Sequence, residues 1–301
     1  MATTPEAYVH LSTDKTTLTF YYDTLRADRN GETWGIREIR DRRISLLSSL
    51  PAWAGYRHSP STTVFTAVFD ASFHDFYPTT TAGWFYEFKS LKSIEGLEHL
   101  NTSQVTDMGC MFYGCASLTS LDLTSFDTSK VTDMGWMFEG CGSLTSLDLT
   151  RFDTSKVTDM GWMFSGCGSL TSLDLTSFDT SKVTDMEEMF SGCESLTALD
   201  LSSFDTSEVS YMRGMFYSCK SLTALDLSSF DTSKVMNMGE MFLGCESLTT
   251  IYCNTSWSAS HSDDMFSGCN SLRGAATNVG NSYDVSMANP ETGYFTKKVL
   301  S

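Results

Sequence analysis

The sequence is poor in proline and in basic residues, and it lacks long apolar runs. Of its 301 residues five are Pro, and 20 Lys and Arg stand against 37 Asp and Glu, which gives a formal net charge of −17. No run of about 18 apolar residues occurs, so the sequence predicts no membrane span. An acidic surface repels nucleic acid and anionic membranes, so neither is expected as a partner.

Motifs for catalysis and for metal binding are also missing. The sequence contains no GxSxG, HExxH, P-loop or GxGxxG motif, and no CxxC or cysteine–histidine cluster that would predict zinc. The histidines lie outside the regular part of the chain, at His10, His58, His74, His99 and His261. An enzyme would need a pocket near the N-terminal end where His58, His74 and a cluster of arginines meet. We interpret that cluster as a solvated surface, and we predict no enzyme, no cofactor and no metal site.

A Met-Phe dipeptide marks an internal repeat of 26 residues. It stands at residues 111–112, 137–138, 163–164, 189–190, 215–216 and 241–242, each time with a Cys three residues after the Phe. A unit this short cannot bury its own apolar face, so the units must stack and share one core, which defines a solenoid. Such an array offers a long repetitive surface and few unique pockets, which favours binding over catalysis.

The spacing of apolar residues within a unit predicts a short strand followed by a short helix. The first part fits the leucine-rich-repeat strand pattern L-x-x-L-x-L-x-x-F. In residues 117–142 these positions are Leu118, Leu121, Leu123 and Phe126. After a polar turn the second part shows the i, i+3, i+4, i+7 spacing of a two-turn helix. Its positions are Met134, Met137, Phe138 and Cys141.

We therefore predict an α/β solenoid, a leucine-rich-repeat-like right-handed stack of short parallel strands and short helices. An N-terminal cap is expected over residues 1–63, with a β-hairpin over residues 6–23 and a helix near residues 36–50. The repeat units would occupy residues 64–269, beginning with a degenerate unit over residues 64–91. Residues 270–301 would form a C-terminal cap that ends in a final strand.

The residue between the two leucines of each strand predicts a row of exposed carboxylates. The row consists of Asp122, Asp148, Asp174, Asp200 and Asp226. Carboxylates about 5 Å apart repel by roughly 1 kcal/mol in water-like surroundings, so each needs a partner. Either the Thr or Ser two residues later and solvent satisfy these carboxylates, or the row binds basic ligand groups or weakly held cations. A second row, at Asp127 and its equivalents in the turn, is interpreted as structural because Asp there can accept turn N–H groups.

The two residues before each Met-Phe dipeptide vary between units and mark a second candidate surface. Trp136 and Trp162 occupy equivalent positions in neighbouring units, and Arg151 and Arg213 are the only basic departures nearby. An aromatic pair on a rigid scaffold is a reasonable binding hot spot. The alternative is that both indole rings lie flat over the gap between neighbouring helices.

The cysteines follow the repeat, and we interpret them as buried free thiols. The regular positions are Cys115, Cys141, Cys167, Cys193, Cys219, Cys245 and Cys269. Neighbouring helices are expected about 8–10 Å apart, which is beyond the Cα reach of a disulfide. Cys110 and Cys253 lie outside this register and are the candidates for reactive or paired cysteines.

The unit LDLTSFDTSKVTDMGWMFEGCGSLTS closely resembles the repeat of BspA-like leucine-rich-repeat surface proteins of oral and gut anaerobes, which also occurs in lipoproteins of wall-less bacteria. The segments TLTFYYD, SIEGLEHLNTSQVTDM and MFSGCNSL through GYFT are similar to segments that flank the repeats in this family. The resemblance implies an adhesin-like, non-catalytic binding protein that recognises host extracellular matrix or another bacterial surface. It supplies no binding residues to transfer.

The first 30 residues hold no apolar segment of the length that a secretion signal needs. The chain is therefore expected to be either a mature form or a cytoplasmic protein, and the resemblance favours an extracellular or cell-surface location. We expect a monomer that binds a protein partner. The alternative is a structural surface spacer without a specific ligand.

Overall fold

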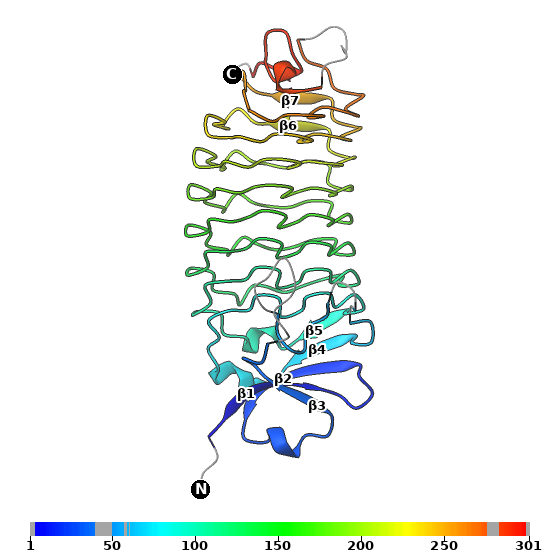
Figure 1. Ribbon diagram of the computed structural model, residues 1–301, viewed down its shortest axis with the longest axis vertical. Helices are drawn as coiled ribbons and strands as arrows, with labels where there is room; N and C mark the ends of the chain where they lie inside the picture. Colours follow the sequence, from blue (N-terminus) through cyan, green and yellow to red (C-terminus); the bar gives the residue numbers. More distant parts are fainter. Residues whose placement is uncertain (1–3, 40–49, 57–58, 60, 276–282, 299–301) are drawn as a thin grey trace.

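The computed structural model describes residues 4–39, 50–56, 59, 61–275 and 283–298. In these ranges the chain forms an elongated stack of loops that begins at a small N-terminal sheet and ends at a short C-terminal segment (Figure 1). Most of the helix predicted near residues 36–50 falls outside the described residues. Within the described ranges, no helix has the length and hydropathy needed to cross a membrane.

Five strands at the N-terminal end form one sheet in the order β3-β1-β2-β4-β5. They are β1 (Glu6–Leu11), β2 (Thr17–Asp23), β3 (Glu32–Gly35), β4 (Thr66–Phe69) and β5 (Ser93–Glu95). The predicted hairpin is confirmed, because β1 pairs antiparallel with β2. β2 then pairs parallel with β4, and β4 pairs parallel with β5. The hairpin is therefore continuous with the first layers of the stack.

Short 3-10 helices flank this sheet and the C-terminal segment. They are η1 (Arg26–Asp28), η2 (Ala71–Asp75), η3 (Leu97–His99) and η4 (Val285–Met287). The side chain of Asp70 caps η2 by accepting the N–H of Ser72, and Asp284 caps η4 in the same way through Ser286. Such short helices depend on caps and on packing, because they contain too few internal hydrogen bonds to be stable alone.

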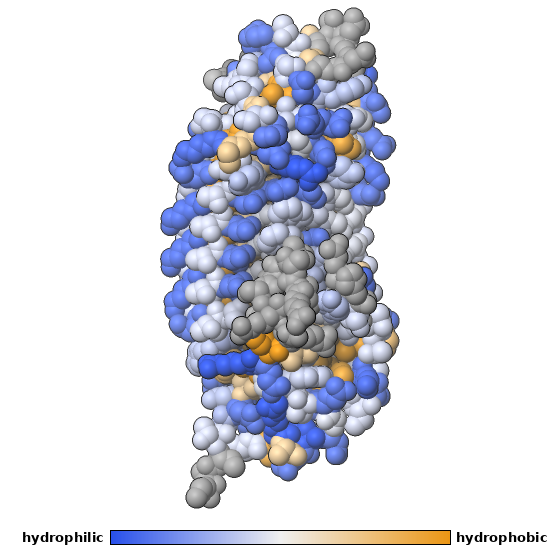
Figure 2. Space-filling view, viewed as in Figure 1, coloured by the Kyte–Doolittle hydropathy of each residue, from blue (hydrophilic) through white to orange (hydrophobic). Residues whose placement is uncertain are grey.

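Each repeat unit adds one layer to a continuous apolar core. The Leu, Val, Met, Phe and Cys positions of successive units are buried in a single cluster. One column of phenylalanines stacks ring on ring from Phe85 to Phe266, with neighbouring ring centroids 5.4–5.8 Å apart. The burial predicted from the apolar spacing is therefore confirmed. On the outer surface, Figure 2 shows hydrophilic side chains in regular rows along one edge of the stack.

The predicted short helices are wrong, because the segment Met134–Cys141 and its equivalents form consecutive turns. The N–H of Met137 bonds to the carbonyl three residues back, at Met134, whereas the N–H of Phe138 bonds to Met163 in the next unit at 3.0 Å. This alternation recurs along the stack. In an α-helix every N–H bonds to the carbonyl four residues back. Here every second N–H instead bonds to a carbonyl of the next unit. The third residues of the first and last of these turns have a left-handed φ, 57° at Trp136 and 71° at Gly140, as a type II turn requires.

The parallel pairing between units is centred on the Val-Thr-Asp-Met segment instead of on the Leu-Asp-Leu segment. Isolated parallel bridges join Thr80, Asp107, Asp133, Asp159, Asp185, Tyr211, Asn237 and His261 in one column. In the described ranges, the Leu-Asp-Leu positions of the regular units form strands only near the C-terminal end, in β6 (Ala224–Asp226) and β7 (Thr250–Tyr252), which β8 (Phe295–Thr296) extends in parallel. The architecture is compatible with a leucine-rich-repeat-like fold, made of turns, bridges and few strands in place of strands and helices.

Candidate binding surfaces

The predicted row of carboxylates lies on the molecular surface beside the buried leucines. Asp174 represents the row: its Oδ1 accepts the N–H of Thr176 at 3.0 Å and the hydroxyl of Thr176 at 2.7 Å. These hydrogen bonds hold the pKa of Asp174 below its usual range. The corresponding bonds from the residue two positions later recur at Asp122, Asp148, Asp200 and Asp226. The Thr and Ser residues therefore satisfy Oδ1 of each carboxylate, whereas binding of basic groups by the row stays a prediction. The row stays ionised at neutral pH.

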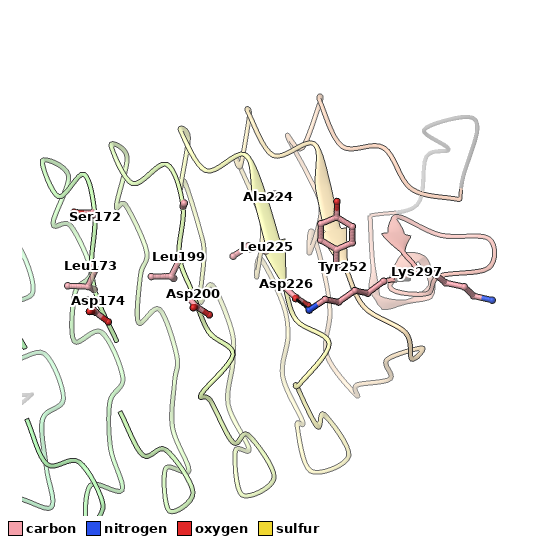
Figure 3. A pocket seen from close by; sticks show the side chains of 12 residues that line it. Ser172, Leu173, Asp174, Leu199, Asp200, Ala224, Leu225, Asp226, Tyr252 and Lys297 are labelled. Carbon is pink, nitrogen blue, oxygen red and sulfur yellow. Dashed lines mark hydrogen bonds and ion pairs between the residues drawn. The ribbon is translucent and has the colours of Figure 1, made fainter. Parts of the chain in front are cut away.

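A groove of about 850 Å³ runs along this row across four successive layers. Figure 3 shows Leu173, Leu199 and Leu225 in consecutive layers, each with an aspartate beside it. The leucines form the floor, with 8%, 9% and 1% of their surfaces exposed. Tyr252 and the segment of Lys297 and Lys298 line the C-terminal end of the groove. We call this site the acidic groove.

One carboxylate of the row already holds an ammonium group. The Nζ of Lys298 donates to Oδ2 of Asp226, while Oδ1 of Asp226 accepts the N–H of Ser228 at 3.1 Å. Burial alone raises the pKa of Asp226, but the hydrogen bonds from Lys298 and Ser228 outweigh it, so the net shift is downward. The row therefore accepts a primary amine on one oxygen without giving up the turn bond on the other. The sequence contained no signal that Lys298 and Tyr252 would join this surface.

Trp136 and Trp162 are stacked, as their equivalent positions predict. Their ring centroids lie 4.9 Å apart with an interplanar angle of 7°, and both side chains are partly exposed. The rings face each other across two units, so they do not lie flat over a gap between helices. Stacking covers one face of each ring, which reduces the aromatic surface open to a partner.

The two arginines proposed beside the tryptophans have different surroundings. Arg213 forms ion pairs with Glu187 at 3.5 Å, Glu188 at 3.0 Å and Glu240 at 2.7 Å, so its charge is used within the stack. The pKa of Asp148 is lowered mainly by its hydrogen bonds with Thr150, and the charge of Arg151 contributes to this shift. Arg151 thus belongs to the surface of the carboxylate row. The predicted site residues therefore lie in two segments of the unit. Trp136, Trp162 and Arg213 precede the Met-Phe dipeptides, whereas Arg151 and the carboxylate row belong to the Leu-Asp-Leu segment.

A third column of carboxylates was not predicted from the sequence. Asp107, Asp133, Asp159 and Asp185 lie partly buried in the column of parallel bridges. Burial raises the pKa of each of them, and that of Asp159 reaches about 6. The carboxylates are close together: a Cβ at Gly135 would lie 3.0 Å from Oδ1 of Asp159 and 3.4 Å from Oδ1 of Asp133. The signal in the sequence is the recurring Asp-Met-Gly, in which glycine leaves room for these oxygens.

This column is not a metal site in the described part of the chain. No group of three or more His, Cys, Asp or Glu side chains there is arranged to hold a metal ion. Each aspartate of the column instead accepts the N–H two residues later, as Asp159 does from Gly161 at 2.9 Å. The carboxylates therefore cap turns within the stack.

All nine cysteines are free and buried. Each regular thiol donates to the carbonyl of a phenylalanine one layer back, as Cys167 does to Phe138 at 3.2 Å. The expected spacing of about 8–10 Å between neighbouring helices is wrong, however, because these segments are turns whose backbones bond directly to the next layer, as Phe138 does to Met163 at 3.0 Å. The interpretation of Cys110 and Cys253 as reactive or paired is also wrong, since both are free and fully buried. Burial raises the pKa of the Cys110 thiol well above its usual range.

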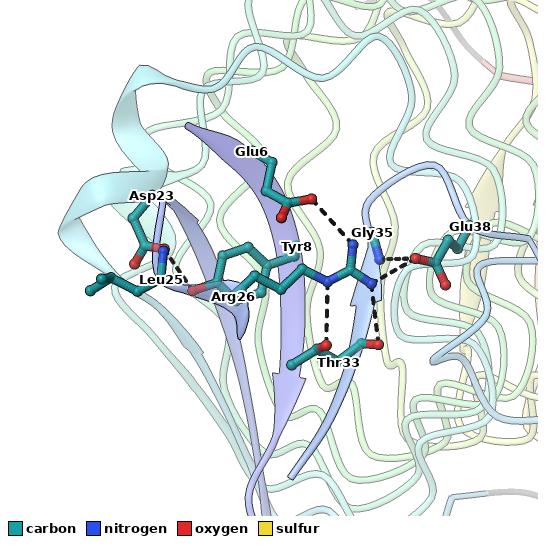
Figure 4. A network of polar contacts seen from close by, with 8 residues as sticks. All are labelled: Glu6, Tyr8, Asp23, Leu25, Arg26, Thr33, Gly35 and Glu38. Carbon is teal, nitrogen blue, oxygen red and sulfur yellow. Dashed lines mark hydrogen bonds and ion pairs between the residues drawn. The ribbon is translucent and has the colours of Figure 1, made fainter. Parts of the chain in front are cut away.

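Two described arginines of the N-terminal end, Arg26 and Arg29, are engaged in ion pairs. Figure 4 shows Arg26 between Glu6 and Glu38, at 3.2 Å and 2.7 Å, with further bonds to Thr33. These contacts connect β1, β3 and the turn after β3. Arg29 pairs with Asp23 at 2.9 Å and lies over the ring of Tyr21. Arg26 and Arg29 therefore stabilise the sheet instead of forming an anion site.

The pocket considered for His58, His74 and the arginines can be followed only at its described members. A cavity of about 480 Å³ lies beside the first layers, lined by Arg37, Trp84 and Asp107 among others, but none of its described lining residues is a histidine. His74 is exposed, with its Nδ1 3.3 Å from Asp75. His58, the other proposed member, lies outside the described residues.

Residues 79–173 and 163–281 match the model of a family described as "Mycoplasma protein of unknown function, DUF285". Together the two matches span more than half of the chain. The chain belongs to this family. The matched residues include the acidic groove up to Tyr252, the stacked tryptophans and the column of bridged aspartates. No protein with a curated description matches the chain.

Several solved structures are similar to the chain. A leucine-rich repeat protein of T. pallidum is 22% identical, with 71% of this chain and 86% of that chain covered and a TM-score of 0.37. A leucine-rich repeat protein from Bacteroides ovatus is 17% identical, with 89% and 92% covered and a TM-score of 0.23. A leucine rich cell surface protein from Faecalibacterium prausnitzii is 16% identical, with 96% and 97% covered and a TM-score of 0.23.

Proposed function

We propose that this protein is a non-catalytic, adhesin-like binding protein of the BspA-like type, which acts outside the cell or on its surface and recognises a protein partner. The observation that carries the proposal is the acidic groove, because its leucine floor and its carboxylate edge repeat in successive layers. A partner that fits one layer meets the same chemistry in the next layer. Contacts repeated in this way build up an interface from individually weak interactions.

The organisation of the stack supports the same proposal. We infer a right-handed solenoid over residues 64–269, with residues 1–63 and 270–301 as caps, because such an array presents a long surface whose geometry is set by a buried core. The core positions are constant from unit to unit, whereas the outward positions vary. A monomer suffices for this function, since the groove is formed within one chain.

A binding screen against host extracellular-matrix proteins and bacterial surface proteins tests the proposal. For a partner found in this way, Asp174→Asn combined with Asp200→Asn should weaken binding about tenfold, because two charged contacts are lost. The same double variant should flatten the salt dependence of binding, since charge steering is screened by salt. Trp136→Ala combined with Trp162→Ala measures the contribution of the second surface. Without any partner in the screen, the alternative of a surface spacer is favoured.

A further inference from the structure

We propose that the acidic groove accepts a basic amphipathic α-helix of the partner, laid along the long axis of the stack. This inference rests on the proposed function and narrows it to one surface and one class of ligand. The ligand is a helix that presents an apolar stripe next to a stripe of Lys or Arg side chains.

The spacing of the layers favours a helix over an extended segment. Equivalent rings of neighbouring layers lie 4.9 Å apart at Trp136 and Trp162 and 5.4–5.8 Å apart along the phenylalanine column. An α-helix returns to the same face about every 5.4 Å, so it drifts by only about 1–2 Å over three layers. Same-face side chains of an extended strand are about 6.7 Å apart, so a strand drifts by about 3–5 Å over the same three layers.

The charge of the groove selects basic side chains. Asp174 and Asp200 are exposed, their turn bonds go to Oδ1, and hydrogen bonds to Thr176 and Ser202 lower the pKa of each carboxyl. Lys298 shows how a ligand lysine would bind, because it uses Oδ2 of Asp226 while the turn bond remains. Asp174 and Asp200 therefore offer the same arrangement to ammonium or guanidinium groups of a partner.

The opposite edge of the groove is small and apolar in the layers of Asp200 and Asp226. Ala198 and Ala224 are exposed there, at the position that Ser172 occupies in the preceding unit. In the floor between the two edges, Leu199 exposes 9% of its surface, and Tyr252 at the C-terminal end of the groove exposes 37%. Small side chains over a leucine floor leave room for the apolar stripe of a docked helix. The neighbouring acidic and apolar edges thus match the two stripes of an amphipathic helix.

Two synthetic peptides of identical Leu and Lys composition separate these geometries. In one peptide the residues follow the helical period, and in the other they alternate strictly, as in a strand. Each peptide is titrated into the full chain by fluorescence anisotropy at low and at physiological salt. We expect the helical-period peptide to bind about tenfold more tightly than the alternating peptide. Equal affinities of the two peptides would overturn the inference.

Four variants locate the binding site. Asp174→Asn with Asp200→Asn should weaken the helical-period peptide about tenfold. The matched control, Asp179→Asn with Asp205→Asn, removes the same charge from the turn row and should change affinity by less than about twofold. Ala198→Trp should block the groove. Lys298→Gln frees Asp226 and removes a competing cation, so it should tighten binding by about threefold. A gain of this kind does not arise from misfolding.

An equal loss in the control double variant would also overturn the inference, because binding would then respond to the net charge of −17 alone. A natural protein partner whose affinity is unchanged by Ala198→Trp would show that the groove is not its site, while the proposed protein-binding function would stand. The reverse result, helical-period peptide binding as expected with no natural partner in the screen, would count against the proposed function and not against the chemistry of the groove.

Discussion

Gly166 stacks directly on Gly140: a Cβ added to Gly166 would lie 3.4 Å from both the Cα and the N of Gly140. Both glycines have a φ of 71°, the left-handed conformation that L-residues with side chains rarely adopt. Gly166→Ala should therefore destabilise the protein by about 1–2 kcal/mol, measured as the free energy of unfolding in urea.

Gly168→Ala is the matched control for this change. Gly168 lies two residues later, has no positive φ, and its added Cβ would meet only the Gly192 carbonyl at an ordinary 3.7 Å. Alanine there should be neutral or should stabilise by up to about 1 kcal/mol, because it reduces the freedom of the unfolded chain. A similar loss in both variants would show that crowding between layers, and not the backbone conformation, dominates.

The partly buried carboxylate of Asp159 should make stability depend on pH. Burial raises its pKa from an ordinary value of 3.8 to about 6, so the folded protein holds this proton more tightly than the unfolded chain does. Ionisation of Asp159 therefore lowers stability as pH rises from about 4 to above 6. Asp159→Asn should be more stable than the parent by about 1–2 kcal/mol at about pH 8, after allowance for solvent screening, and the difference should vanish near pH 4.

Two residues of the chain help to interpret the Asp159→Asn experiment: Asn237 as a natural asparagine at the same position of the repeat, and Asp174 as a control. Asn237 occupies the equivalent position and accepts the N–H of Gly239 at 2.9 Å, so asparagine keeps the turn bond. Asp174→Asn should show the opposite sign, because hydrogen bonds with Thr176 lower the pKa of Asp174. Its carboxylate adds stability above its ordinary pKa, and that contribution disappears on acidification. Urea unfolding across the pH range distinguishes the two variants.

The cysteine ladder should be reduced and inaccessible in the folded protein. All nine thiols are free and buried, and burial raises the pKa of the Cys167 thiol well above its usual range, which suppresses the reactive thiolate. Thiol titration without reductant should therefore detect all nine cysteines in denaturant and few in the native state. Disulfides detected in the denatured sample would contradict the ladder of thiol-to-carbonyl hydrogen bonds.

Phe178 tests the layered core in a middle unit. Its side chain is only 2% exposed, so Phe178→Ala should destabilise the protein by about 3–5 kcal/mol through lost burial and a residual cavity. Phe65, which is 40% exposed, is the control, and Phe65→Ala should change the free energy of unfolding by less than about 1 kcal/mol. An effect of that small size at Phe178 would mean that its layer is not packed as described.

The sequence predicts the carboxylates of the acidic groove but not the C-terminal residues that complete it. The period of 26 residues places Asp174 and Asp200 at equivalent positions in neighbouring units, so a row of carboxylates follows from the sequence alone. Their hydrogen bonds to Thr176 and Ser202 follow as well, since they connect residues two positions apart. Lys298 is 72 residues from Asp226, and no local pattern shows which layer the C-terminal segment reaches.

The repeat, the inward positions and the outward rows follow from the sequence, because solvent sorts apolar from polar side chains whatever the backbone does. The backbone conformation of each unit depends on the assembled stack. The spacing of Met134, Met137, Phe138 and Cys141 suits a helix, but the N–H of Phe138 finds its acceptor at Met163 in the next unit. Backbone hydrogen bonds within a unit compete with hydrogen bonds between layers. The bonds between layers can form only after the units have stacked. The same stacking partly buries Asp159, and so it creates a raised pKa that no single unit would show.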